Sequence, residues 1–325
     1  MLTTPTTFVL GAGASKPYGM PLASEVKDYI GGLKPRAEEY RLLLSSGVDP
    51  HELNDLIDDV RGYPLPSFDS YLEMRKSDAK TIEIGTAVLA ATIGKAISHA
   101  SGRAEIGQDW IAYVVRQMLE GAATCRSFAE GNAKVAFITF NFGWILEARL
   151  RELLSRAYSS HDDVQTALDS LQVLHMHGRL PALDGLVGSP MFDSRSGRVH
   201  PGWCQWLNGA RQALNVTSDA ISASTLHAAQ AHVAGSRVLC FLGFGYHADN
   251  LRQLNIPAGL PATLPGQHSI FGSAYGCFHG ERERIKSRLL NRIVLGGQDM
   301  GCLDVLRSLD VFQECSMQES SFDLT

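Results

Sequence analysis

A short glycine-rich segment near the N-terminus holds the first residues whose types and spacing could do chemistry. Residues 11–15 read Gly-Ala-Gly-Ala-Ser and directly follow a β-prone run at residues 7–10. Small residues at the end of a strand let the backbone approach a pyrophosphate, and the N-terminus of a following helix offers free N–H groups. The segment therefore predicts a phosphate-binding turn in a nucleotide-binding α/β unit. A tight turn that binds no ligand is the alternative.

Two common nucleotide-binding motifs do not fit this segment. The dehydrogenase fingerprint G-x-G-x-x-G requires glycine or alanine at position 16, where the chain has Lys16. A P-loop requires Gly-Lys followed by serine or threonine, and the segment lacks that sequence. The pattern thus disfavours both an NAD dehydrogenase and a P-loop ATPase.

The composition is that of an ordinary globular protein. The chain has 325 residues, of which 45% are hydrophobic and 19% charged, and its formal net charge is −5. This balance indicates neither nucleic acid nor a membrane as the main partner, and the apolar stretch at residues 86–94 is too short to span a bilayer. The six cysteines show no C-x-x-C spacing, which predicts reduced thiols and a cytoplasmic protein.

The elements around the glycine-rich segment predict a parallel sheet. Further strands are predicted at residues 135–139, 171–176, 237–242 and, as the last strand, 269–272, with a helix at 281–293 after it. Residues 35–130 are predicted to be helical. We therefore expect an α/β, Rossmann-type doubly wound sheet formed by residues 1–34 and 131–325, with a helical insertion at 35–130 after the first βα unit, packed over the site as a cap.

Three further motifs occur later in the chain, and together with residues 11–15 they form a pattern that can be compared with known families. They are Thr-Phe-Asn-Phe at residues 139–142, His-Met-His-Gly at 175–178 and Phe-Leu-Gly-Phe-Gly-Tyr-His-Ala-Asp-Asn-Leu at 241–251. Together with residues 11–15, and over nearly the whole chain, they resemble the sirtuin-like NAD-consuming domains of bacterial anti-phage defence effectors, such as those of the Thoeris type. Each motif alone is weak, but each follows a predicted strand.

The resemblance implies cleavage of the nicotinamide–ribose bond of NAD, giving nicotinamide and ADP-ribose or a cyclised relative, without a metal. Asn141 matches the catalytic asparagine of the family and His177 its catalytic histidine. The residues that match its NAD-binding segments are Gly11, Ala12, Gly13 and Ser15 in the first turn and Gly243, Phe244 and Gly245 in a later loop.

An amide and an imidazole suit this reaction. Breaking an N-glycosidic bond passes through an oxocarbenium-like sugar, so the enzyme must stabilise positive charge and direct a nucleophile. Asn141 can donate to and accept from a ribose hydroxyl or a water, and His177 can take a proton near neutral pH. The alternatives are that Asn141 satisfies a turn backbone and that His177 is a solvated strand-end residue. His175 is predicted to pack, and a metal site formed by the two histidines is disfavoured because no third ligand is near.

One position departs from the family pattern. The family usually has an acidic residue two positions after the catalytic asparagine, where this chain has Gly143. A carboxylate would have to come from elsewhere, and Asp69, which is equally well placed to begin a helix, is the candidate. The departure keeps open a non-catalytic module that binds NAD or ADP-ribose. A protein deacylase is disfavoured because the four zinc cysteines of deacylase sirtuins are missing.

The expected partners follow from the same resemblance. Such effectors are held silent by oligomerisation or by other proteins, so we expect a homo-oligomer or a separate sensor or ATPase that supplies the trigger. Within residues 280–293, Arg284, Arg288 and Arg292 recur at helical spacing and predict a cationic ridge. A solvated helix face is favoured over a nucleic-acid contact there, because no aromatic residues are interleaved.

Overall fold

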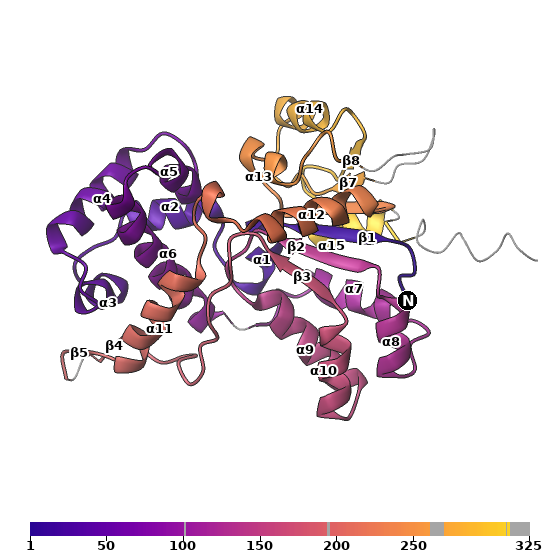
Figure 1. The fold of residues 1–325 in the computed structure, drawn as a ribbon, viewed down its shortest axis with the longest axis horizontal. Coiled ribbons are helices and arrows are strands. Elements are labelled where there is room, and N and C mark those ends of the chain that lie inside the picture. The colour runs from indigo at the N-terminus through magenta and orange to yellow at the C-terminus, as the bar shows by residue number, and fades with distance from the viewer. Residues whose placement is uncertain (101, 194–195, 261–269, 310, 313–325) are drawn as a thin grey trace, which may run out of the picture.

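The computed structural model describes residues 1–100, 102–193, 196–260, 270–309 and 311–312 (Figure 1). A 6-stranded sheet has the order β3-β2-β1-β6-β7-β8, and every neighbouring pair is parallel. After β1 the chain adds β2 and β3 on one side of it. It then crosses to the other side of β1 and adds β6, β7 and β8. This is the strand order of Rossmann-type doubly wound folds, so the predicted α/β class is confirmed. The strands are β1 (Thr6–Leu10), β2 (Val135–Thr139), β3 (Gln172–His175), β6 (Val238–Leu242), β7 (Ile270–Gly272) and β8 (Ile293–Leu295).

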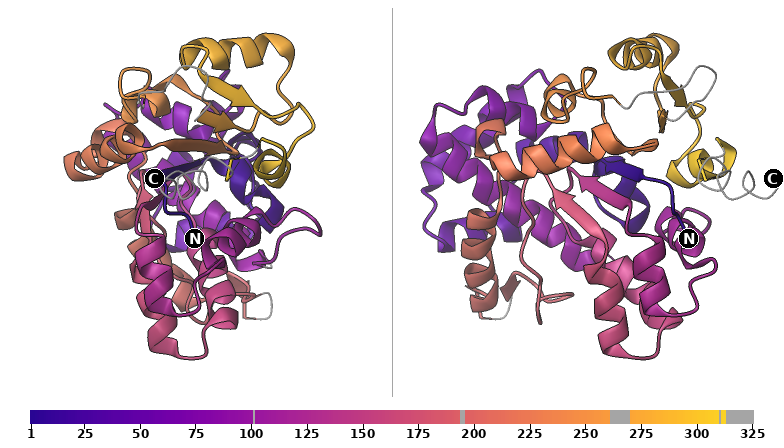
Figure 2. Two further views of the ribbon diagram at one scale, coloured as in Figure 1. Left: turned by 90° about the vertical axis from the view of Figure 1, so that its right-hand side faces the viewer. Right: turned by 45° about the vertical axis from the view of Figure 1, so that its right-hand side comes forward.

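The three central strands are buried along their whole length because helices cover both faces of the sheet. Val9 and Phe241 belong to one buried cluster, which includes residues of α12 (Ala223–Gly235), α13 (Ala248–Gln253) and α14 (His279–Arg288). Figures 1 and 2 show α12 lying across this face. The residues next to them in sequence, such as Phe8 and Cys240, face the opposite cluster. That cluster includes residues of α7 (Trp110–Leu119), α9 (Ile145–Ala157) and α15 (Cys302–Ser308).

Two sequence predictions about the last part of the sheet are wrong. The strand predicted at 269–272 is not the last strand of the sheet, because β8 follows it. Position 269 lies outside the described residues. Cys315, one of the six cysteines, also lies outside them. The helix predicted at 281–293 ends at Arg288, since Leu290 and Asn291 take left-handed backbone conformations with φ of 55° and 58°. Arg292 therefore does not continue the predicted cationic ridge, and the Arg288 guanidinium donates to the Tyr246 carbonyl at 2.6 Å.

A group of helices stands to one side of the sheet (Figure 1). It consists of α2 (Ala23–Gly31), α3 (Glu38–Ser45), α4 (Pro50–Gly62), α5 (Phe68–Met74) and α6 (Ala79–His99). We call it the helical region. From later in the chain, α11 (Pro201–Ala213) and the hairpin of β4 (Phe192–Asp193) and β5 (Arg198–Val199) pack against α3, and α11 also packs against α6. By contrast, α7 and α8 (Cys125–Gly131) pack beside α9, α10 (His161–Asp169) and α15.

Helix α6 is the core of the helical region. By length and composition it could cross a membrane, but 72% of its most apolar window is buried inside the protein. Gly85 and Gly94 allow Leu72 and Trp206 to pack directly against its backbone. Its apolar character is therefore explained by packing within the protein.

Candidate functional site

A large cavity lies at the carboxyl edge of the sheet, between β1 and β6, where the order in which the chain adds strands to the sheet reverses. Its volume is about 770 Å³, and the segments after β1, β6 and β7, the start of α15 and helix α5 form its walls. Open α/β sheets bind their ligands at this switch point, and small-molecule sites occupy about 300–1,000 Å³. The topology thus places a cavity of ligand size beside the glycine-rich segment.

The glycines predicted to bind the cofactor are in contact with one another. Gly13 donates its N–H to the Gly243 carbonyl at 3.0 Å, and a Cβ at Gly11 would lie 2.5 Å from the same oxygen. Gly243 has a φ of 56°, and a Cβ there would overlap the backbone of Gly13 and Ala14. The small residues are therefore required for the loops after β1 and β6 to pack backbone against backbone.

The predicted phosphate turn has few free amides. Helix α1 (Ala12–Ser15) has only 4 residues and runs into a 3₁₀ turn, η1 (Lys16–Tyr18). The N–H of Ala14 donates to the Gly11 carbonyl at 2.9 Å, and the N–H of Gly13 is also used within the protein. Both glycines line the cavity, as does Ala12, but most of the donors expected to meet a phosphate already have partners.

The Asn141 side chain joins the end of β2 to the glycine-rich segment. Its Nδ2 donates to the Gly11 carbonyl at 3.0 Å and to Ser15 Oγ at 3.0 Å. Within the described residues Oδ1 accepts no hydrogen bond, so this oxygen is the atom left for a ligand. Asn141 and Ser15 line a smaller cavity of about 60 Å³, together with Phe68, Phe140 and Phe142. The amide therefore satisfies a turn carbonyl, as the alternative interpretation expects, and also presents an acceptor beside a cavity.

His177 lies just beyond β3 and lines the large cavity. Its ring packs between Phe140 and Phe142, with centroid distances of 5.5 and 5.8 Å. Nδ1 is 3.2 Å from the Asn215 carbonyl, which can only accept, so Nδ1 carries the proton and Nε2 of the neutral ring is free to act as a base. Burial lowers the pKa of His177, although the Asp69 carboxylate acts in the opposite direction. The neutral form is therefore favoured.

The turn after His177 depends on its glycine. Gly178 has a φ of 75°, and a Cβ there would overlap the Ala213 carbonyl. The main chains of His177 and Asn215 also bond directly, since the Asn215 N–H donates to the His177 carbonyl at 2.8 Å. Two contacts with the segment after α11 thus hold the imidazole in place.

Asp69 comes from the helical region and lines both cavities. It lies in the first turn of α5, where Ser67 serves as the N-cap by accepting from the Ser70 N–H at 3.1 Å. Asp69 is therefore free of the capping role. Burial raises the pKa of Asp69, and the nearby His177 and His247 oppose this shift. Asp69 makes no hydrogen bond or ion pair with any residue that the structure describes.

The structure brings the two predicted catalytic residues to one sheet edge but to adjoining cavities. Asn141 lines the smaller cavity and His177 the larger, while Asp69 and Phe140 line both. Gly143 also lines the smaller cavity, and a Cβ there would lie 3.3 Å from Ile97 Cδ1. A side chain at this position would meet the apolar surface of α6, whereas Asp69 supplies a carboxylate to the same cavity.

The predicted loop after β6 is partly structural. The Phe244 ring packs against Phe140, Phe241 and Tyr246 at centroid distances of 5.2, 5.5 and 5.4 Å. Gly245 is exposed and lines the large cavity. Sequence reasoning did not anticipate how acidic this cavity is: its lining carboxylates are Asp69, Glu73, Glu105, Asp249, Asp299 and Asp304. Its one lining lysine or arginine among the described residues, Lys16, is paired with Glu25 at 2.6 Å.

His175 does not serve mainly as a packing residue, contrary to the sequence prediction. Its Nε2 lies 2.7 Å from Glu147 Oε1 on α9, so it belongs to a polar cluster separate from the partners of His177. Within the described part of the chain, no group of three or more His, Cys, Asp or Glu side chains is placed to hold a metal ion.

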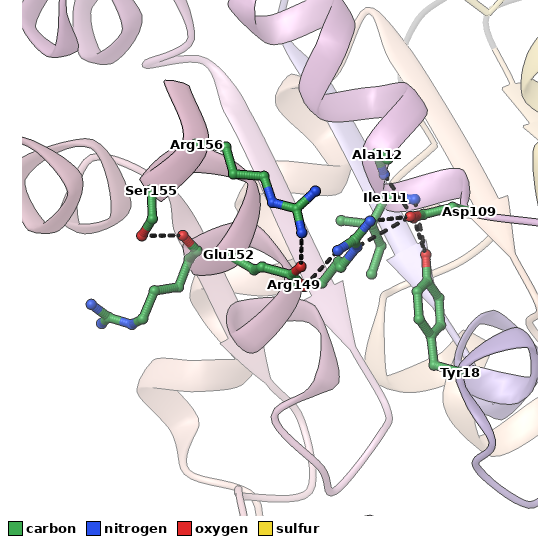
Figure 3. Close-up of polar contacts among 9 residues, drawn as sticks. Tyr18, Asp109, Ile111, Ala112, Arg149, Glu152, Ser155 and Arg156 are labelled. Atoms are coloured by element: carbon green, nitrogen blue, oxygen red, sulfur yellow. Dashed lines mark hydrogen bonds and ion pairs between the residues drawn. The ribbon is translucent and has the colours of Figure 1, made fainter. Parts of the chain in front are cut away.

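A second polar cluster links Tyr18, which follows the glycine-rich segment, to Asp109 and Arg149 (Figure 3). The Tyr18 hydroxyl donates to Asp109 Oδ1 at 2.9 Å and accepts from the Ile111 N–H at 3.1 Å. Asp109 forms an ion pair with Arg149 of α9 at 2.5 Å. Next to it, Trp110 Nε1 donates to the Ala14 carbonyl at 2.7 Å. These contacts fix the segment that follows β1 to α7 and α9.

Comparison of the chain with protein-family models and with curated proteins finds no match.

Proposed function

We propose that the protein is a sirtuin-like NAD glycohydrolase. Water and NAD would give nicotinamide, ADP-ribose and a proton: the bond between C1′ and the nicotinamide nitrogen breaks, its electron pair leaves with the neutral base, and water oxygen bonds to C1′. A cyclised product would form where an atom of the substrate replaces the water. The NAD-depleting effector of a cytoplasmic anti-phage defence system is the biological role that the motif resemblance supports.

One observation carries this proposal. Asp69 from the helical region and His177 from the sheet edge line the same cavity at the switch point, and each shifts the pKa of the other. A carboxylate that makes no hydrogen bond or ion pair with the described residues can stabilise the positive charge that develops on the sugar, and a neutral histidine can take the proton of the attacking nucleophile. The pair supplies both groups that the reaction needs.

Asn141 would act beside them. Its Nδ2 is held by Gly11 and Ser15, so the direction of Oδ1 is fixed before a ligand arrives. A fixed acceptor can orient a ribose hydroxyl or the attacking water, and such preorganisation avoids an entropy loss during the reaction. The aromatic lining of the smaller cavity suits the flat nicotinamide ring.

The test is release of free nicotinamide from NAD by the purified protein, alone and with the products of neighbouring genes. We expect Asn141→Ala and His177→Ala each to lower kcat by about 100-fold or more, the usual contribution of a positioned proton-transfer group. Matched melting temperatures would exclude misfolding. A wild-type protein that releases no nicotinamide under any of these conditions contradicts the proposal.

A non-catalytic module that binds NAD or ADP-ribose is the second candidate. The observation that favours it is Gly143 in place of an acidic residue. Such a module would bind NAD in calorimetry without releasing nicotinamide. Release that depends on an acetylated peptide would instead indicate the deacylase, which the missing zinc cysteines disfavour.

A further inference from the structure

The polar cluster around His175 contacts the backbone of Asn141. His175 Nδ1 is 3.3 Å from the Asn141 carbonyl oxygen, and Nε2 is 2.7 Å from Glu147 Oε1. Arg179 donates to the same carboxylate oxygen at 3.1 Å. The side chain of His175 is only 12% exposed and that of Glu147 is 23% exposed, so water competes little for these contacts. The ring therefore bridges α9 and the backbone of the candidate catalytic asparagine.

The hydrogen-bond chemistry of this bridge is restrictive. A carbonyl oxygen accepts only, so Nδ1 must donate to Asn141. Burial alone would raise the pKa of Glu147, but its hydrogen bonds with His175 and Arg179 lower the pKa overall, so its carboxylate is ionised and also accepts. Each ring nitrogen of His175 thus faces an oxygen that accepts a hydrogen bond.

We propose that His175 is a positioning residue that fixes the backbone, and through it the side-chain amide, of Asn141, with Glu147 holding the other side of the ring. The inference rests on the proposed function for its catalytic consequence only. The contact of His175 with the Asn141 carbonyl adds to the two contacts that Asn141 Nδ2 makes with Gly11 and Ser15. Misplacement of a reacting group by about 1 Å can lower a rate about 100-fold.

Two substitutions separate the two contacts of the ring. In His175→Asn the amide nitrogen occupies the place of Nδ1, and in His175→Gln it occupies the place of Nε2. If His175 positions Asn141, His175→Gln lowers kcat by about 10- to 100-fold with little change in KM for NAD, and His175→Asn lowers kcat less. If His175 only supplies a hydrogen bond to Glu147, His175→Asn lowers kcat at least as much as His175→Gln does. That result overturns the proposal. His227→Gln, an exposed histidine on α12, is the matched control and leaves kcat unchanged.

A readout without turnover keeps this inference separate from the proposed function. With selectively ¹⁵N-labelled histidine and asparagine, we expect a proton on Nδ1 of His175. We also expect a larger shift of the Asn141 side-chain amide signal in His175→Gln than in His175→Asn. An unprotonated Nδ1, or an Asn141 signal indifferent to both variants, overturns the proposal even if NAD is cleaved. If NAD is not cleaved, these signals alone decide it. Should His175→Gln not fold, Glu147→Gln keeps the ring and is expected to shift the same Asn141 signal.

Discussion

The two sides of the glycine-rich segment differ in how their polar groups are satisfied. On the side of α7 and α9, Tyr18, Asp109 and Arg149 form a connected cluster in which each side chain has a partner on another element (Figure 3). On the side of the large cavity, Asp69 lacks a hydrogen-bond or ion-pair partner among the described residues, and burial raises its pKa. Satisfied groups hold the fold in place, whereas a half-buried carboxylate that makes no hydrogen bond or ion pair with the described residues is available to a ligand.

Gly243 lies where the two sides meet, and its replacement has the largest expected effect. In Gly243→Ala the new Cβ would overlap the backbone of Gly13 and Ala14, and alanine would also be strained at a φ of 56°. We expect a loss of more than about 4 kcal/mol in the free energy of unfolding, or no folded protein. Urea unfolding followed by circular dichroism measures this loss.

Gly276→Ala is the matched control for that substitution. Gly276 has a φ of 72°, but a Cβ there would meet nothing within 4 Å. Gly276→Ala should therefore lower the free energy of unfolding only by the cost of a left-handed alanine, about 1–2 kcal/mol. Equal losses in the two variants would show that the contact between the loops contributes little, and the two sides would then be less tightly joined than the structure indicates.

Much of this fold could be predicted from the sequence because its central strands are continuous apolar runs. β1, β2 and β6 are buried along their whole length, and that burial dictates their composition. β8 could not be predicted in the same way. It has 3 residues and follows a helix whose apolar periodicity continues past the true end at Arg288. The left-handed backbone at Leu290 and Asn291 has no signal in residue type strong enough to end that pattern.

Most residues of the candidate site could be named from the sequence because they follow predicted strands. Asn141, His177 and the glycines can be found this way because the carboxyl ends of parallel strands share one edge. The environment of Asp69 depends on how the helical region packs over that edge, which no local pattern encodes. The contact of His175 with Glu147, 28 residues earlier, is equally a product of tertiary packing.

Tyr18→Phe is expected to change the stability less. It tests the side of the glycine-rich segment that faces α7 and α9. The substitution removes the hydrogen bond to Asp109 and leaves the buried Ile111 N–H without its acceptor. An unsatisfied buried N–H costs about 1–3 kcal/mol, and we expect a loss in that range from urea unfolding. In Tyr40→Phe, the control, only a bond to the exposed Asn54 is lost, and water can replace it. A Tyr18→Phe protein as stable as Tyr40→Phe would mean that the cluster does not fix the segment.

The smallest change in stability, with the opposite sign, is expected from Asp69→Asn on the cavity side. Because the pKa of Asp69 is raised in the folded protein, its ionised form destabilises the fold as pH rises above the ordinary value of 3.8. Asp69→Asn removes this penalty, so it should be more stable than wild type at pH 7, by an amount that shrinks as pH falls toward 4. Its kcat should fall even so, and because Asp69 raises the pKa of His177, the acidic limb of the pH–rate profile should move to lower pH. Urea unfolding at several pH values and a pH–rate profile measure the two effects. A variant that loses stability at pH 7 would show that Asp69 has a structural partner after all, and the contrast between the two sides of the segment would no longer hold.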